Sequence, residues 1–349
     1  MQRFILGALA FGAAAALTSH VPATAAEKGF NTPGNILIAD QFNNRVIEVN
    51  PKGKIVWSFG LGPNDFSANS VLGVNDAERV GQNTLMAGTG IPAGVDPNCN
   101  NGCPDNRVML VNPAGKIVWQ YGQFGVTGSG PNELNAPVQA TYTQQNTVFI
   151  TDQGNQRVIE VDKKGNVLWQ YGKTGVAGSG KDELNSPNSA EALDNGDILI
   201  ADEGNNRVIE VDMASKKIVA TFTAQGTLVG PAFASLLPNG QILITDGGNN
   251  RVVTVDSGDD VQFQYFTNAQ QGSNPNPAPS RAIETKAGNI VISDQFNNRV
   301  IVIDGSQDIL AQYGNLNVIG YGTKNTKQGL YAPYDAKVIG DYTGLTPPK

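Results

Sequence analysis

Polar side chains of differing chemistry recur at one position of a repeated segment. Six times along the chain, the two residues that follow a proline or its equivalent begin the innermost strand of a repeat unit. Among them, Asp76, Asn188 and Asp335 supply oxygen atoms of the kind that Ca²⁺ prefers. Arg281 comes from another copy and can pair with Asp335 or bind an anionic group. The predicted binding residues are Asn75, Asp76, Gln139, Asn188, Ser189, Arg281 and Asp335.

Two interpretations of these residues stay open. They could hold a ligand, with Asp76, Asn188 and Asp335 as the metal ligands if a metal binds. Alternatively, they hydrogen-bond to one another around a water-filled channel. The sequence requires no cofactor, and Ca²⁺ is the metal that the donor set suggests.

The single histidine restricts the chemistry. His20 lies in a segment that we expect to be removed, so the mature chain would carry none. Three-His zinc sites, Ser-His-Asp and Cys-His nucleophiles and c-type haem attachment are then excluded. The catalytic residues are unassigned. If the protein is an enzyme, we expect a metal-dependent hydrolase of the lactonase type.

Residues 1–25 are predicted to form a signal peptide. Arg3 precedes an uncharged apolar run from Phe4 to Leu17, and Ala23-Thr24-Ala25 has the small-x-small pattern that signal peptidase accepts. A retained N-terminal anchor is the alternative. We expect a secreted or periplasmic protein whose residues 26–349 form one domain.

The charge balance limits the partners. Loss of Arg3 leaves 23 Lys and Arg (24 − 1) against 31 Asp and Glu, a formal net charge of −8. An acidic surface without a Lys/Arg cluster disfavours nucleic acid and anionic membrane. The expected partner is a small molecule, a glycan or a protein.

One unit repeated six times must position these side chains. Its arginines are Arg45, Arg107, Arg157, Arg207, Arg251 and Arg299. Short apolar runs, turn residues and alternating patterns predict four antiparallel strands in each unit of about 45–50 residues. The fold class is therefore all-β, a six-bladed β-propeller of four-stranded blades. The Asp–Arg pair of each turn, such as Asp40 and Arg45, is interpreted as scaffold, and the three tryptophans as packing between blades.

The chain ends predict how the ring closes. The first copy lacks a preceding strand, whereas Pro333-Tyr-Asp-Ala336 has no copy after it. We expect this C-terminal strand to complete blade one, which removes free sheet edges.

Blade two carries an inserted loop, residues 90–104. Thr89 stands where other copies have Asp, and Cys99 and Cys103 are predicted to form a local disulfide, with a redox-active pair as the alternative. We expect this loop beside Asn75 and Asp76 as a functional rim; a tolerated surface insertion is the other interpretation.

The turn Asp-x-x-Asn-x-Arg-Val and the linkers over residues 124–137 and 174–187 resemble those of NHL-repeat propellers. The resemblance covers almost the whole mature chain. It implies a fold but no single function, because such propellers serve as binding platforms, lyases and hydrolases.

Two functions follow from these observations. The first is an exported, non-catalytic binding or scaffold propeller that recognises a small molecule, glycan or protein at the channel face. The second is a divalent-metal-assisted, lactonase-like hydrolase with the metal at the channel mouth. Ser186-Pro187-Asn188 is similar to a Pro-Asn element of gluconolactonase propellers, and Asp335 falls at a comparable strand start, but their blade-one Glu has no counterpart here.

Overall fold

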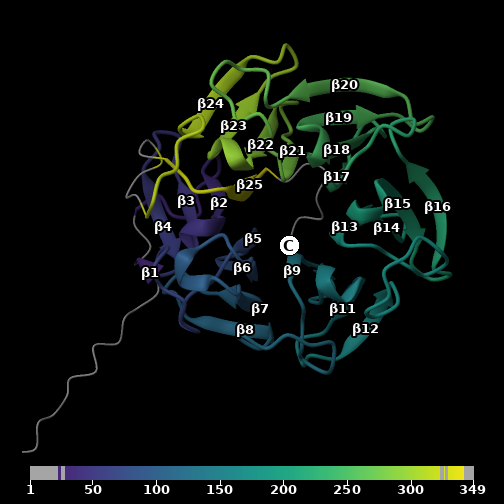
Figure 1. Ribbon diagram of the computed structural model, residues 1–349, viewed down its shortest axis with the longest axis horizontal. Helices are drawn as coiled ribbons and strands as arrows, with labels where there is room; N and C mark the ends of the chain where they lie inside the picture. Colours follow the sequence, from purple (N-terminus) through teal and green to yellow (C-terminus); the bar gives the residue numbers. More distant parts are fainter. Residues whose placement is uncertain (1–22, 25–27, 323–325, 327–328, 342–349) are drawn as a thin grey trace, which may run out of the picture.

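Six four-stranded sheets surround a central axis (Figure 1). The structure is a computed structural model that describes residues 23–24, 28–322, 326 and 329–341. Blade one contains β2 (Ile36–Asp40), β3 (Arg45–Val49), β4 (Ile55–Phe59) and β25 (Pro333–Val338), and blade two contains β5 (Val74–Val80), β6 (Asn83–Ile91), β7 (Cys103–Val111) and β8 (Ile117–Gly122). The predicted all-β six-bladed propeller is confirmed.

The other four blades follow the same antiparallel order, each beginning with its innermost strand. Blade three contains β9 (Pro137–Tyr142), β10 (Val148–Asp152), β11 (Arg157–Val161) and β12 (Val167–Tyr171), and blade four contains β13 (Pro187–Ala192), β14 (Asp197–Asp202), β15 (Arg207–Asp212) and β16 (Lys217–Phe222). Blade five contains β17 (Pro231–Leu236), β18 (Ile242–Asp246), β19 (Arg251–Val255) and β20 (Val261–Phe266), and blade six contains β21 (Arg281–Glu284), β22 (Ile290–Asp294), β23 (Arg299–Ile303) and β24 (Ile309–Gly314).

The C-terminal strand closes the ring. β25 pairs antiparallel with β2, from Asp40 opposite Pro333 to Ile36 opposite Val338, as the sequence predicted. A two-residue strand, β1 (Ala23–Thr24), pairs with β4 at the outer edge of blade one. These two residues fall within the predicted signal peptide, whose residues 1–22 lie outside the described residues. No helix in the described part of the chain is long and apolar enough to cross a membrane.

The hydrophobic core is divided among the seams between blades. Leu37 and Trp57 of blade one pack with Ala77 and Met86 of blade two in one buried cluster. Five further clusters fill the other seams. Both faces of each sheet are therefore buried, which is why the strands are rich in Val, Ile and Leu.

The tryptophans support the first three seams, as the sequence predicted. The indole Nε1 of Trp57 donates to Pro113 O in blade two at 3.0 Å. Trp119 and Trp169 make the same bond to the next blade, with Lys163 O at 3.1 Å and Met213 O at 2.9 Å. Their indoles are thus used for packing between blades.

The repeated Asp and Arg tie one turn in each regular blade. In blade four, Arg207 Nε donates to Asp202 Oδ2 at 2.7 Å across a single turn of 3-10 helix, η4 (Glu203–Asn205). The other oxygen of Asp202 accepts the backbone N–H of Asn185 at 2.8 Å, which holds the linker before β13. Equivalent turns are η1 (Gln41–Asn43), η3 (Gln153–Asn155), η5 (Gly247–Asn249) and η6 (Gln295–Asn297).

The residue after each of these turns forms a latch to the next blade. Asn44, Gln156, Asn206, Asn250 and Asn298 all have left-handed backbone angles, as does Asn106 in blade two. In blade six, Asn298 Oδ1 accepts the backbone N–H of Ala332, next to the start of β25, at 3.0 Å. At all six seams the side-chain oxygen of the equivalent Asn or Gln accepts a backbone N–H from the next linker, so the latches form a closed ring.

Blade two reaches the same geometry with a different residue. Asp105, on the third strand, pairs with Arg107 with an Nε–Oδ1 distance of 2.5 Å. Its second oxygen accepts the backbone N–H of Leu72 at 2.7 Å. Leu72 occupies the linker position that Asn185 occupies in blade four, where Asp202 accepts the N–H. The loss of the repeat Asp at Thr89 is therefore compensated.

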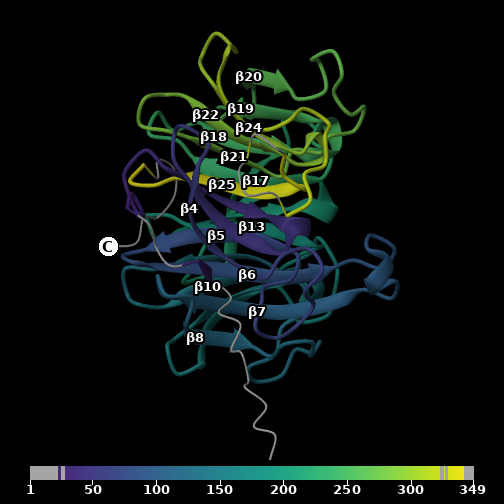
Figure 2. The same ribbon diagram turned by 90° about the vertical axis from the view of Figure 1, so that its left-hand side faces the viewer.

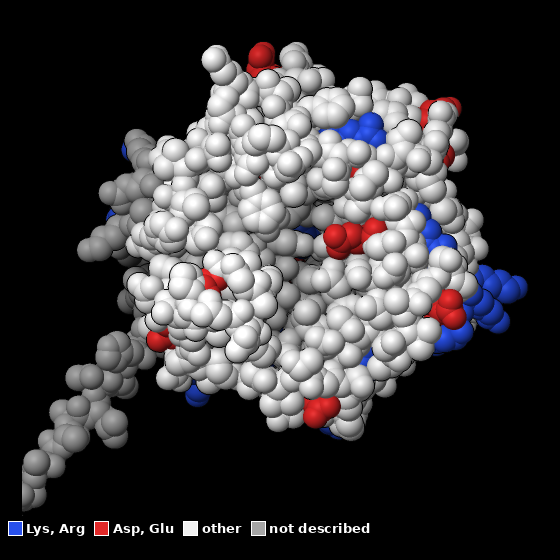
Figure 3. Space-filling model, in the orientation of Figure 1, with Lys and Arg blue, Asp and Glu red and all other residues white. Residues whose placement is uncertain are grey.

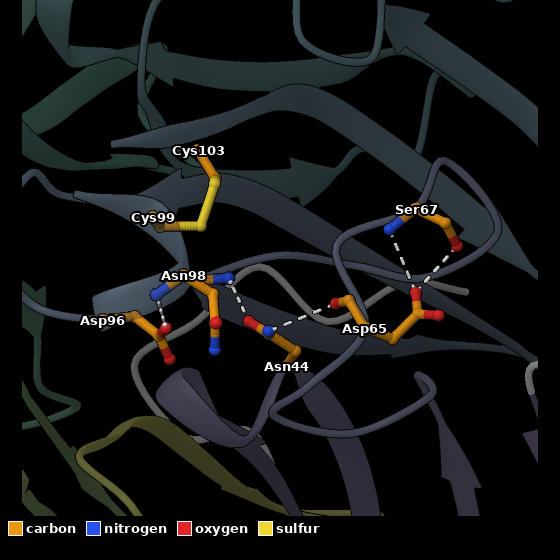
Figure 4. The surroundings of a disulfide bond; sticks show 8 residues. Asn44, Asp65, Ser67, Asp96, Asn98, Cys99 and Cys103 are labelled. Atoms are coloured by element: carbon orange, nitrogen blue, oxygen red, sulfur yellow. Dashed lines mark hydrogen bonds between the residues drawn. A yellow bond between two sulfur atoms is a disulfide. The ribbon is translucent and has the colours of Figure 1, made fainter. Parts of the chain in front are cut away.

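The insertion in blade two stands on one face of the ring, where β6 and β7 continue as a long hairpin (Figure 2). Its base bonds to the linker just before β5, with Gly90 N donating to Leu72 O at 3.0 Å. Cys99 and Cys103 form the predicted disulfide beside η2 (Pro97–Cys99), near Asn44 and Asp65 (Figure 4). The loop thus lies beside the start of β5, as expected.

Candidate channel-mouth site

One face of the propeller collects the features that differ among blades. The turns after the second strands, the starts of the innermost strands and the insertion all lie on this face, which we call the mouth face. Figure 3 views it and shows a central hollow with acidic side chains on one side. The seven predicted binding residues all begin innermost strands, and all are buried.

Four of these residues hold the neighbouring innermost strand. Asp335 Oδ2 accepts the backbone N–H of Ala77 at 3.1 Å, and Asp76 Oδ2 that of Ala140 at 3.2 Å. Gln139 and Ser189 do the same for Ala190 and Ala234, at 2.6 and 3.2 Å. The innermost strands are sheet edges with unpaired N–H groups, so these side chains satisfy donors that would otherwise be buried without a partner.

Asp76 and Asp335 lie together, with two cations between and beside them. Lys337, two residues after Asp335, donates to Asp76 Oδ1 at 2.8 Å and also to Asp335 Oδ2. Arg281 Nη2 lies 3.2 Å from Asp76 Oδ1, and Arg281 Nε lies 3.2 Å from Asp335 Oδ1. These four side chains form a charge-balanced ion cluster that joins blades six, one and two.

The ion cluster sets the protonation of its members. Burial by itself raises the pKa of Asp335, but Lys337 and Arg281 lower it below the ordinary value. Burial likewise disfavours the charge on Lys337, but the two carboxylates raise its pKa above the ordinary value. Lys337 and Asp335 are therefore charged at neutral pH.

Two glutamates lie below this layer without a cation in contact. Burial raises the pKa of Glu78 and that of Glu191 well above the ordinary value. Glu78 Oε1 and Glu191 Oε2 make no hydrogen bond with the described residues. Burial therefore favours the protonated form of both side chains over the charged form.

Only two of the three candidate metal ligands lie together in the fold. Asp76 and Asp335 share Lys337, whose ammonium takes the place between them. Asn188 instead bonds to Tyr334 and Glu203 at the mouth. No group of three or more His, Cys, Asp or Glu side chains suited to a metal occurs among the described residues. This arrangement does not fit a divalent cation, so Ca²⁺ stays a prediction that the geometry does not favour.

Tyr334 crosses the channel above the ion cluster. It starts from blade one, and its Oη lies 2.9 Å from Asn188 Nδ2 in the opposite blade, blade four. Asn188 Nδ2 also donates to Glu203 Oε2 at 2.8 Å, and Gln153 Nε2 donates to the same oxygen at 3.1 Å. Tyr334 therefore covers the charged interior and forms the floor of the mouth.

On the other side of the mouth, Gln295 Nε2 donates to Gln41 Oε1 and Gln41 Nε2 donates to Asn75 Oδ1, both at 2.8 Å. Gln41, Gln153, Glu203, Gly247 and Gln295 occupy the same position of their repeats, the first residue of the 3-10 turn. Three amides, one carboxylate and one glycine therefore occupy this position in the five regular blades.

A pocket of about 240 Å³ opens where this ring is smallest. Small residues of blades four to six line it, among them Gly230, Ala232 and Gly247. Its polar lining comes from Asn188, Glu203, Ser280, Gln295 and Tyr334.

Sequence reasoning found Asn188 but missed Glu203, Tyr334 and Lys337 as parts of the site. Glu203 was hidden within a repeat that is otherwise scaffold, yet it is the one charged residue among its equivalents Gln41, Gln153, Gly247 and Gln295. A comparison at that repeat position would have singled it out. Tyr334 and Lys337 carry no such signal, because their roles depend on contacts across the channel.

These features define the protein as a six-bladed β-propeller with a capped channel. A family model described as outer membrane protein assembly factor BamB matches residues 155–308, less than half of the chain. No curated protein matches the chain. The NHL-repeat resemblance stays an interpretation of the repeat sequence.

Similar solved structures agree with the fold. A protein of unknown function from Bacteroides caccae is 14% identical, with 80% of this chain and 93% of that chain covered and a TM-score of 0.56. A structure titled nidogen/laminin complex is 12% identical over 90% and 99%, with a TM-score of 0.54. A streptogramin B lyase is 12% identical over 82% and 80%, with a TM-score of 0.52. At these identities the likeness shows the fold alone.

Proposed function

We propose that the protein is an exported, non-catalytic binding propeller that recognises a small molecule, glycan or protein at its mouth face. The observation that carries this proposal is the pocket beside Tyr334, which opens at Gly247, where the other regular blades carry Gln or Glu. At about 240 Å³ the pocket is smaller than most drug-sized ligand sites, so it suits a molecule of few atoms or one terminal group of a glycan or protein.

The chemistry of the channel supports binding over catalysis. Asp76 and Asp335, the carboxylates that a hydrolase would use, accept hydrogen bonds from backbone N–H groups and from Lys337. Such groups hold the strands together and are poorly placed to activate water. The disulfide and the partial match to a family of outer membrane assembly factors support export.

Thermal unfolding with a panel of neutral, anionic and cationic small molecules tests the binding proposal. A ligand at about one hundred times its Kd adds about 2.7 kcal/mol to the free energy of unfolding. The matched variant is Gly247→Gln, which places the residue of three other blades into the pocket. A ligand that stabilises the wild type and this variant equally binds elsewhere and contradicts the proposal.

The second candidate, a lactonase-like hydrolase with a divalent metal, is favoured by one observation, the closeness of Asp76 and Asp335. Its test is the melting temperature with Ca²⁺ and with EDTA. Because Lys337 already neutralises these carboxylates, we expect the two melting temperatures to agree. A Ca²⁺-dependent rise that Asp76→Ala abolishes would favour the hydrolase.

A further inference from the structure

Glu203 is a partly exposed carboxylate at the mouth, and no cation of the described residues contacts it. Its Oε2 accepts hydrogen bonds from Asn188 and Gln153, both neutral amides. Its Oε1 accepts none from the residues that the structure describes, and it lies 4.0 Å from where a Cβ on Gly230 would be. Carboxylates with reduced exposure are ordinarily paired with a cation or with several donors, so Glu203 Oε1 is an acceptor that a ligand in the pocket can use.

Most of the side-chain hydrogen-bond donors that line the pocket already donate within the protein. The Asn188 amide donates to Glu203 and to Tyr334, and the Gln295 amide donates to Gln41. Ser280 Oγ donates to the backbone oxygen of Tyr334 at 2.7 Å. A ligand in this pocket therefore meets mainly acceptors, and it must supply the donors itself.

Backbone oxygens extend the acceptor set. Two backbone oxygens lie close to Gly247: a Cβ at this position would lie 3.1 Å from Pro279 O and 3.4 Å from Gly230 O, closer than most Cβ atoms approach an oxygen. Both oxygens therefore face the part of the pocket that a side chain fills in other blades. Three acceptors, Glu203 Oε1 and the two carbonyl oxygens, match the three N–H groups of an ammonium ion in number.

Burial raises the pKa of Glu203, and its hydrogen bonds from Asn188 and Gln153 offset this only in part. A bound cation would favour the charged form and relieve this cost. Arg281 and Lys337 lie deeper in the channel, where they form ion pairs with Asp76 and Asp335.

We infer that the pocket between Glu203 and Gly247 is a binding site for the ammonium group of a primary amine. This inference rests on the proposed binding function and names its ligand class. Glu203 recognises the charge of the ligand. The two backbone oxygens and the pocket volume restrict the ligand to a slender, unbranched amine.

The test is an NMR titration of the full chain, at constant ionic strength and pH 7.5, with three probes of the same length. We expect n-butylammonium to bind, while n-butanol and butyrate do not. Glu203→Gln should weaken binding of n-butylammonium about tenfold or more, the size of a charge-assisted hydrogen bond. This variant carries the residue of Gln41, Gln153 and Gln295, so its melting temperature should match that of the wild type.

Two further variants complete the test. Gly247→Gln should abolish binding, because it fills the space beside Glu203. Glu183→Gln should leave the affinity unchanged, because Glu183 is a partly exposed carboxylate paired with Lys173 outside the pocket.

Binding of n-butylammonium that Glu203→Gln leaves intact overturns the inference, and so does a failure of the wild type to bind this probe. If n-butanol or butyrate binds instead, and Gly247→Gln blocks it, the ammonium site is wrong while the binding function stands. If Gly247→Gln changes the binding of no probe in this series or in the wider panel, the binding function fails as well.

Discussion

The seams between blades and the central channel are built from the same six repeats, but they use them in opposite ways. At the seams, every latch oxygen accepts from the equivalent backbone N–H, and even blade two reproduces the turn through Asp105. In the channel, equivalent positions carry Asp76, Gln139, Ser189, Phe233, Arg281 and Asp335. Contacts that are repeated hold the ring, whereas contacts that occur once define what the ring can bind.

The largest expected loss of stability follows a substitution at the irregular turn of blade two, where Asp105 replaces the repeat Asp. Asp105→Ala would leave Arg107 buried without its carboxylate and Leu72 N–H without an acceptor. Loss of one partner of a buried ion pair costs about 3–5 kcal/mol. Urea unfolding should show this loss, and Thr89→Ala, at the position of the missing repeat Asp, should cost far less. Equal effects would mean that Asp105 does not replace the repeat Asp.

The channel should respond next. Lys337→Met removes the cation between Asp76 and Asp335, and we expect the free energy of unfolding to fall by about 3 kcal/mol, at the lower end of the range because Asp76 can take up a proton. Adding Asp76→Asn should restore part of the loss, measured by a double-mutant cycle in urea. Additive losses would show that the two residues do not interact.

A single latch should matter less. Asn298→Gly keeps the left-handed backbone but leaves the buried N–H of Ala332 without an acceptor, which costs about 1–3 kcal/mol. Asn298→Gln is the control, because Gln156 forms the same latch in blade three. Thermal unfolding of both variants measures the difference. If Gln is no better than Gly, the latch bond contributes little.

The smallest expected effect is a pH dependence of the free energy of unfolding that comes from Glu191 in the channel and not from the seams. Because burial raises the pKa of Glu191, the folded protein holds its proton more tightly than the unfolded chain. The free energy of unfolding must therefore fall as the pH rises from the ordinary pKa of glutamate toward the raised pKa, by about 1.4 kcal/mol for each pH unit that separates these two pKa values. Glu191→Gln should match the wild type at low pH and be more stable at pH 8.

The matched control for this pH effect is Glu183→Gln. Lys173 lowers the pKa of Glu183, so its contribution has the opposite sign and is present only above the ordinary pKa of glutamate. The control should therefore show no gain at pH 8. A loss of stability at pH 8 in Glu191→Gln would mean that Glu191 is charged and paired in the folded protein.

The sequence alone determined the number of blades, their four strands, the closing strand and the disulfide. It could do so because each is a local or periodic property: strand alternation, turn residues, and the unpaired Pro333-to-Ala336 segment at the end. It also brought Asp76, Arg281 and Asp335 into one candidate site, because equivalent positions of a closed repeat meet at the axis.

Only the tertiary structure decided what these residues do. Lys337 neutralises Asp76, and Tyr334 reaches Asn188 across the channel. Glu203 contacts two amides and no cation of the described residues. All three outcomes depend on side chains far apart in the sequence. Periodicity places a residue at the axis, but the length and direction of the opposing side chains decide whether it bonds to the scaffold or faces a ligand.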